Sequence, residues 1–408
     1  MIPRGDNYRG GRAPVPIGTA PPAREAARPP LAVVRPSMPS PLRQIVDSYD
    51  PNAPLDQAWT IPSDWYADPR IADLETRTVF GRSWQRAGRV EQVAQPGQYV
   101  TDELAREPVL VVRGADSRLR AFFNVCRHHA AAVMTEAGGK AASMRCPYHG
   151  WTYGLDGQLL GTPDFAGVCN FDRAANGLVP IAVATWEGFV FVRLDAEGTS
   201  LEEFLGEDLI AQFRALGLAG YQFMERRRYV FECNWKVFVD NYLDGGYHIP
   251  YLHKGLDSVL DYRRYSIENG RRHCLQKSPM VREGAEPETG AVRQGKLALY
   301  YWIYPNFMVN WYEGVMDTNL VRPLAVDRTE VIFDFYFPDV SSEEARRRNL
   351  ASINVGQRIQ DEDTSICRSV QRGLISRAYR AGRLSVRREA GEHLFHRLLH
   401  ADLSRGLE

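Results

Sequence analysis

The sequence predicts an α+β protein, in which a mostly-β region precedes a larger region that combines an antiparallel sheet with helices. Short apolar runs of strand type lie at residues 109–112, 122–125 and 190–192. A second set of apolar and aromatic runs lies within residues 298–337, and helix-like segments at 234–256 and 342–374 flank it. Runs of strands grouped apart from long helices favour α+β over an alternating α/β order.

Composition excludes several classes of protein. The 408 residues carry 50 Lys plus Arg and 50 Asp plus Glu, so no bulk charge points to nucleic acid. No stretch approaches the roughly 20 apolar residues of a membrane span. Six cysteines are too sparse for a disulfide scaffold, which favours a reducing compartment and predicts a cytoplasmic protein.

The first 45 residues differ from the rest of the chain. Residues 1–43 contain ten prolines and seven arginines but only two acidic residues, Asp6 and Glu25. Such a segment buries too little apolar surface to offset its ordering entropy, so we expect residues 1–45 to form a disordered tail. Organelle targeting by residues 1–43 is the alternative. Residues 46–79 should form a helical or irregular segment that packs on the C-terminal region.

Four soft metal ligands occur within 24 residues of the β-rich part. They form the pairs Cys126-x-His128 and Cys146-x-x-His149. Structural zinc sites usually pair like ligands, whereas here each half supplies one thiolate and one imidazole. Two cysteines on one iron and two histidines on the other make a Rieske [2Fe–2S] centre. The neighbouring His129 is not expected to be a ligand.

A second pair of histidines lies in the segment NWKVFVDNYLDGGYHIPYLHKGL. His248 and His253 are five residues apart, so on an unbroken helix they would diverge by about 140°. Gly245, Gly246 and Pro250 interrupt the helix at this point, which allows both imidazoles to face one ion. A carboxylate would complete a 2-His-1-carboxylate iron site with open positions for O2 and substrate.

The phrases CRHHA and RCPYHGWTYGLDG closely resemble the Rieske domain of the Rieske non-haem iron oxygenase alpha subunits. Among these, the segments DNYLDGGYHIPYLHKGL, YPNFMVN and MDTNLVRPL are similar to the choline monooxygenases. The resemblance covers roughly residues 60–400. It implies a Rieske domain at 80–195 and a helix-grip-like catalytic domain at 196–408 that holds mononuclear Fe(II). By this match Asp363, in a downstream helix, is the third iron ligand, with Asp361 and Glu362 as the alternatives.

The resemblance also implies a homotrimer, in which a carboxylate joins the cluster of one subunit to the iron site of the next. Asp244, four residues before His248, is the candidate, and Asp240 is the alternative. Relatives often have this acid three residues before the histidine, where this chain has Gly245. The partner at the cluster would be His149 or His128, of which we favour His149.

The implied reaction is an O2-dependent monooxygenation of a quaternary or N-methylated amine. Choline, oxidised to betaine aldehyde hydrate, is the first candidate. The alternatives are N-demethylation of carnitine-like or betaine-like amines and hydroxylation of an aromatic or natural product. Because no G-x-G-x-x-G follows a strand, electrons should come from a separate NAD(P)H-dependent reductase or a ferredoxin.

Two further groups of residues have a spacing that could bind a substrate cation or a metal. The aromatic segment 298–324 could build a cation-binding box, for which we name Tyr301, Tyr304, Phe307 and Trp311. Glu313 or Asp317 could supply a counter-ion. His393, His396 and His400 share one face of a C-terminal helix; this spacing could hold a metal, but we interpret it as an amphipathic helix that buries Leu394, Leu398 and Leu399.

Overall fold

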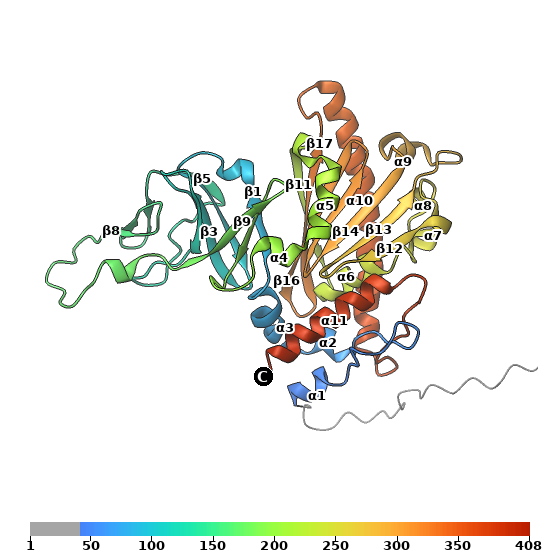
Figure 1. Cartoon of the computed structure of the whole chain (residues 1–408), viewed down its shortest axis with the longest axis horizontal. Coiled ribbons are helices and arrows are strands. Elements are labelled where there is room, and N and C mark those ends of the chain that lie inside the picture. The colour runs from blue at the N-terminus through green and yellow to red at the C-terminus, as the bar shows by residue number, and fades with distance from the viewer. Residues whose placement is uncertain (1–40) are drawn as a thin grey trace, which may run out of the picture. The chain divides into compact units, whose positions relative to one another are not determined.

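The computed structural model describes residues 41–408, drawn in colour in Figure 1. Most of the predicted N-terminal tail lies outside the described residues, and so does most of the alternative targeting segment. The described part begins with helix α1 (Leu42–Val46), so ordered structure starts before the predicted tail ends at residue 45. Within residues 41–408, no helix is long and apolar enough to cross a membrane.

The N-terminal β region is built on an antiparallel seven-stranded sheet in the order β1-β10-β9-β4-β3-β2-β5. Its strands are β1 (Gln85–Arg89), β2 (Gln98–Leu104), β3 (Glu107–Arg113), β4 (Leu119–Phe123), β5 (Gly138–Lys140), β9 (Pro180–Trp186) and β10 (Phe189–Arg193). A separate three-stranded sheet contains β6 (Met144–Arg145), β7 (Thr152–Tyr153) and β8 (Leu159–Gly161). This small sheet carries the second Cys/His pair.

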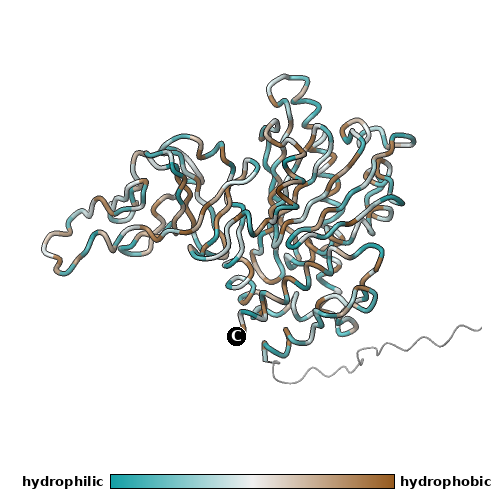
Figure 2. Tube along the Cα trace, viewed as in Figure 1, coloured by the Kyte–Doolittle hydropathy of each residue, from teal (hydrophilic) through white to brown (hydrophobic). Residues whose placement is uncertain are grey.

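The C-terminal region contains a second antiparallel seven-stranded sheet, in the order β11-β17-β16-β15-β14-β13-β12. Its strands are β11 (Gln222–Phe231), β12 (Ser266–Asn269), β13 (His273–Pro279), β14 (Leu297–Ile303), β15 (Phe307–Tyr312), β16 (Val315–Ala325) and β17 (Arg328–Phe337). Every neighbouring pair is antiparallel, and hydrophobic residues follow the strands in Figure 2. The predicted α+β fold with an antiparallel catalytic sheet is therefore confirmed.

Helices cover both faces of this sheet. The helices that follow α1 are α2 (Asp64–Ala67), α3 (Pro69–Glu75), α4 (Leu201–Leu205), α5 (Glu207–Leu216), α6 (Trp235–Leu243), α7 (Ile249–Leu252), α8 (Lys254–Asp257), α9 (Pro287–Val292), α10 (Glu343–Leu374) and α11 (Ala390–Arg405). Phe213 of α5 packs on Tyr301 of β14, whereas Gly356 of α10 lies beside Phe335 on the other face. The long helix α10 starts at Ser342, whose side chain accepts a hydrogen bond from the Ala345 N–H.

The two sheets meet at a buried carboxylate. Asp334 of β17 is fully buried, and it bonds Arg226 through two hydrogen bonds of 2.6 and 2.8 Å and also contacts Arg86 of β1. Burial alone would raise the pKa of Asp334, but the arginines outweigh it and lower that pKa to about 2. Beside this ion cluster, the rings of Phe189 and Phe307 pack edge to face with centroids 5.4 Å apart.

Candidate active site

The first candidate site lies in two matching loops of the N-terminal β region. Cys126 follows β4 and Cys146 follows β6, and both thiols are buried. In each loop the carbonyl of the cysteine accepts a backbone hydrogen bond from four residues ahead, from Ala130 at 3.0 Å and from Gly150 at 3.1 Å. These turns direct the following histidine side chains toward each other.

The imidazoles of His128 and His149 face one another with ring centroids 4.6 Å apart. His128 stacks on Trp151, and its buried Nδ1 has no hydrogen-bond partner in residues 41–408. A buried ring nitrogen without a partner suits a metal ligand. The Tyr153 hydroxyl accepts a hydrogen bond from the Arg127 N–H and lies 3.4 Å from the Cys126 sulfur. Two thiols and two imidazoles held in this way fit a Rieske cluster.

The second candidate site begins where α6 ends. Asp244 caps α6, and Gly245 and Gly246 follow with φ of +66° and +69°. A Cβ on Gly245 would lie 2.0 Å from the Arg388 carbonyl oxygen, so the turn requires glycine. The chain then passes through His248 directly into the short helix α7 and leaves it at His253.

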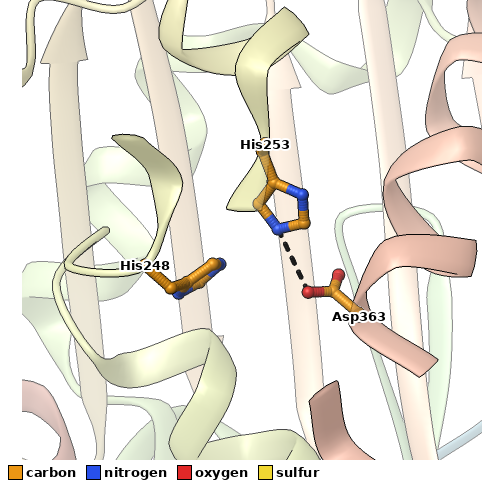
Figure 3. Close-up of side chains that lie close together, drawn as sticks. All are labelled: His248, His253 and Asp363. Atoms are coloured by element: carbon orange, nitrogen blue, oxygen red, sulfur yellow. Dashed lines mark hydrogen bonds and ion pairs between the residues drawn. The ribbon is translucent and has the colours of Figure 1, made fainter. Parts of the chain in front are cut away.

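The turn and the short helix bring the two imidazoles together. Their ring centroids are 4.9 Å apart, and Asp363 reaches them from α10 (Figure 3). The Oδ1 atom of Asp363 lies 3.1 Å from His253 Nε2, and the ligand atoms of all three residues lie within 4.8 Å of one another. The Asn241 side chain donates a 3.0 Å hydrogen bond to the same carboxylate oxygen. This set fits a 2-His-1-carboxylate iron site.

The alternative carboxylates of α10 lie elsewhere. Glu362 contacts the outer nitrogen of His253, with Oε2 2.6 Å from Nδ1, and so can fix that ring's tautomer. Asp361 accepts a hydrogen bond from Gln357 on the exposed side of the helix. Of the three acids considered from the sequence, only Asp363 reaches the Nε2 atom of His253.

Asp244 contacts the other imidazole, that of His248. Its Oδ2 atom lies 2.5 Å from His248 Nδ1 and also accepts the His248 backbone N–H at 3.0 Å. Asp240, the alternative to Asp244, points away and bonds Tyr66 and His396 instead. The structure therefore brings Asp244, and not Asp240, onto a predicted iron ligand.

A cavity of about 100 Å³ opens beside these residues, between the catalytic sheet and α10. Its aromatic and polar wall contains Tyr242, Tyr265, Tyr300, Tyr312, Phe333, Phe335, Asn310, Asp317, Asn319 and Arg293. Along α10 it extends from Asp363 back to Gly356, a rise of about 10 Å. The iron site and the cavity therefore form one continuous candidate site.

The four aromatic residues expected to bind substrate do not line this cavity. Tyr301 packs on Phe213, the Tyr304 hydroxyl donates to Asp402, and Phe307 packs against Phe189. Trp311 is also absent from the wall.

The correction follows from strand alternation, because successive side chains point to opposite faces of a sheet. Tyr300 and Tyr312, each one position from an expected residue, face the cavity, and their hydroxyls are 2.8 Å apart. Asn310 and Asp317, directly opposite each other across β15 and β16, face it too. Polar residues in otherwise apolar strands were the sequence signal for the correct face.

Asp317 is the buried acid of this wall, whereas Glu313 is exposed in the turn before β16. The Asp317 carboxylate accepts hydrogen bonds from Asn310 at 2.7 Å and Asn319 at 3.0 Å. Burial raises the pKa of Asp317, although Arg293 and the two amides partly offset this. An ionised Asp317 would therefore gain from a cationic ligand.

Comparisons with known proteins identify a family for each of the two regions. A family model described as the Rieske [2Fe-2S] domain matches residues 83–172, and one described as the ring hydroxylating alpha subunit (catalytic domain) matches residues 218–404. Choline monooxygenase, chloroplastic, of Arabidopsis thaliana is 38% identical over 375 residues, covering 89% of this chain and 87% of that protein. The chain is a Rieske non-haem iron oxygenase.

Other relatives of this oxygenase have different names. The carnitine monooxygenase oxygenase subunit of Escherichia coli strain K12 is 32% identical over 341 residues, covering 79% of this chain and 86% of that protein. A quaternary ammonium Rieske monooxygenase in complex with its substrate L-carnitine superimposes with a TM-score of 0.74 at 30% identity, over 85% of this chain and 96% of that one. The predicted cofactors, a Rieske [2Fe–2S] cluster and a mononuclear iron, are therefore confirmed.

Proposed function

We propose that this oxygenase hydroxylates a quaternary or N-methylated amine, with choline, converted to betaine aldehyde hydrate, as the first candidate. The observation that carries the proposal is the cavity beside His248, His253 and Asp363, where tyrosine rings surround the buried Asp317 carboxylate. The names of the relatives agree with this class of substrate.

A trimethylammonium group suits such a wall. Each well-placed aromatic face contributes about 0.5–2 kcal/mol toward a cation, and Tyr300, Tyr312 and Phe335 all line the cavity. A quaternary ammonium cannot donate hydrogen bonds, so it does not compete with the amides of Asn310 and Asn319 for the Asp317 carboxylate. The carboxylate and rings would therefore bind the cation and direct the rest of the substrate toward the iron ligands.

The protein residues would divide the remaining tasks as follows. We propose that Cys126, Cys146, His128 and His149 hold the cluster and that His248, His253 and Asp363 hold the iron. When bound, the cluster supplies single electrons and the iron supplies the centre for O2 activation. Asn241 orients the Asp363 carboxylate, and Glu362 and Asp244 orient the two imidazoles.

Oxidation of choline to its aldehyde hydrate with O2 also requires two electrons and two protons and releases water. Rieske oxygenases receive these electrons from a reductase. We propose a homotrimer in which Asp244 of one subunit meets the exposed His149 of its neighbour. Tyr247 and Tyr251, on either side of His248, are exposed, Tyr251 by 79%, as a subunit contact there would require.

Arg293 supports a second candidate. Its buried guanidinium lines the same cavity and lies over the Tyr312 ring, 4.9 Å from the ring centroid. A substrate that carries both a trimethylammonium and a carboxylate could use Asp317 and Arg293 together. N-demethylation or hydroxylation of a carnitine-like or betaine-like amine is therefore the alternative to choline oxidation.

A reconstituted turnover distinguishes the candidates. The purified oxygenase, with Fe(II), NADH and a surrogate reductase, is supplied with choline, carnitine or glycine betaine, and the products are measured by mass spectrometry together with O2 uptake. Betaine aldehyde formed in equal amount to the O2 consumed supports the first candidate. Formaldehyde with a demethylated amine supports the second. If the cluster is reduced but no amine is oxidised, the proposed substrate class is wrong.

A further inference from the structure

A second group of potential metal ligands lies apart from the iron site. Helix α11 places Glu392 and His396 one turn apart, and Asp240 of α6 faces them. His396 Nε2 lies 3.0 Å from Asp240 Oδ1 and 3.8 Å from Glu392 Oε1. The ligand atoms of all three residues lie within 4.8 Å of one another. The cluster shares no residue with the iron triad.

Glu392 has only a long ion-pair contact with His396 in this cluster of described residues. Its side chain is only 7% exposed, and it accepts no hydrogen bond within the range 41–408, His396 being its nearest ionic neighbour. Together with Asp240 it lines a cavity of about 180 Å³, which is wide enough for water. A buried carboxylate without a hydrogen bond is expensive unless a cation or a proton compensates it.

Neighbouring negative charges make an ionised Glu392 still less favourable. Burial raises the pKa of Glu392 well above its ordinary value, and the carboxylates of Asp240, Glu389 and Asp244 add to the effect. Lys236 is the cation on the adjacent turn of α6, but it is paired with Glu75 at 2.6 Å. Three further carboxylates therefore lie near Glu392, and Lys236 does not pair with it.

We propose that Asp240, Glu392 and His396 form a second site for a divalent metal ion of the Zn²⁺ or Mn²⁺ type. One imidazole and two carboxylates suit these ions, and the adjoining cavity leaves room for water ligands. The Tyr66 hydroxyl donates to the other oxygen of Asp240 and so orients this ligand. The ion would join α6 to α11 directly behind Asn241, which bonds the iron ligand Asp363.

Zinc content tests the proposal. The full chain carrying His248→Ala and His253→Ala, which removes the competing iron site, is dialysed against Zn²⁺ and then against buffer, and zinc is measured by mass spectrometry. We expect about one Zn²⁺ per chain, and loss of most of it in Glu392→Gln. The matched control is Glu389→Gln, which removes a neighbouring charge but no ligand and should keep the zinc.

Three results would overturn the site. Equal zinc in the parent and in Glu392→Gln means that Glu392 is not a ligand, and equal loss in Glu389→Gln means that only the negative field attracts the ion. No zinc in the parent means that a proton alone compensates Glu392. The Rieske absorbance checks that each variant folds. If Glu392→Gln loses it, His396→Gln and the Zn²⁺-dependent rise in Tm of the parent chain decide.

Discussion

At the scale of single residues, Asp317 combines a proposed role in binding with an unfavourable position for a charge. Its carboxylate is buried in the cavity wall, where among residues 41–408 only the amides of Asn310 and Asn319 donate hydrogen bonds to it. The desolvation that raises its pKa also makes a cationic ligand favourable there. Binding and stability should therefore respond in opposite directions to its removal.

Asp317→Asn keeps the shape and the acceptor oxygen but removes the charge. A charge-assisted contact contributes about 1.5–3 kcal/mol, so we expect the KM for choline to rise about 10- to 100-fold with a smaller change in kcat. Because the folded pKa of Asp317 is raised, its ionisation lowers stability as pH rises above the ordinary range of Asp, so the variant should gain Tm relative to wild type toward neutral pH. Glu313→Gln is the control, and an equal KM change there would contradict the assignment.

Asp244→Asn tests the proposed link between subunits. The amide can still accept the backbone N–H of His248, so iron should stay bound while turnover falls about 10- to 100-fold. Iron content and the rate at which the reduced cluster is reoxidised in the presence of substrate and O2 check this. Loss of the iron would instead make Asp244 part of the metal site itself.

These residues also show what the sequence could predict. The spacing of Cys126, His128, Cys146 and His149 singles out those side chains because few other soft ligands are near them in the chain. The four aromatic residues named from the sequence do not line the cavity, since an aromatic run such as residues 300–304 does not reveal which of its alternating side chains face that side of the sheet. That choice depends on the helices that cover each face, and those are fixed by tertiary packing.

At the scale of elements, the iron site depends on how α6 stops. Two successive glycines in the left-handed region turn the chain, and α7 then separates the two histidines. The sequence predicted the interruption from Gly245, Gly246 and Pro250. It could not by itself select Asp363 from the acids of the long helix α10, because that choice rests on a contact across 110 residues.

Gly245→Ala should disrupt this turn. The left-handed conformation costs an alanine about 1–2 kcal/mol, and its Cβ would also collide with the Arg388 carbonyl, so we expect a lower Tm and loss of mononuclear iron. Gly217→Ala is the matched control, because Gly217 has φ of +63° but open space around it. If both variants retain iron and lose the same stability, the close contact at Gly245 has no role in the site.

At the scale of the whole molecule, Asp334 ties the N-terminal sheet to the catalytic sheet. Its lowered pKa of about 2 corresponds to about 2 kcal/mol of stability that is present above the ordinary pKa of 3.8 and is lost as pH falls toward 2. Asp334→Asn should cost about 3–5 kcal/mol at neutral pH, because three arginines lose their counter-charge.

Urea unfolding of Asp334→Asn and wild type between pH 3 and 7 measures this effect. The difference in unfolding free energy should shrink toward pH 3, where wild-type Asp334 is mostly protonated in the unfolded state but still mostly ionised in the folded state. Asp73→Asn is the control, since that carboxylate pairs with Arg106 on the exposed surface. A difference that does not change with pH would contradict the assignment to Asp334 ionisation.

The proposed homotrimer predicts complementation between inactive chains. His149→Ala should lack a working cluster and His248→Ala should lack the iron, so each alone is expected to be inactive. If electrons pass between neighbouring subunits, co-expression of the two chains should restore part of the turnover. No activity in mixed oligomers that mass spectrometry shows to have formed would contradict transfer between subunits.

The cytoplasmic location stays a prediction.

Helix α10 carries both Asp363 and the wall of the cavity around Gly356, so the period of one helix fixes how the proposed iron ligand and the cavity wall are oriented relative to each other. Each residue added between them would rotate one relative to the other by about 100° and move it by about 1.5 Å. Substitutions along residues 356–363 can therefore change the shape of the cavity gradually. A single insertion or deletion there would instead turn the cavity wall away from the iron ligands. Diversification of this scaffold toward new substrates should proceed by exchange of side chains at constant length in this segment.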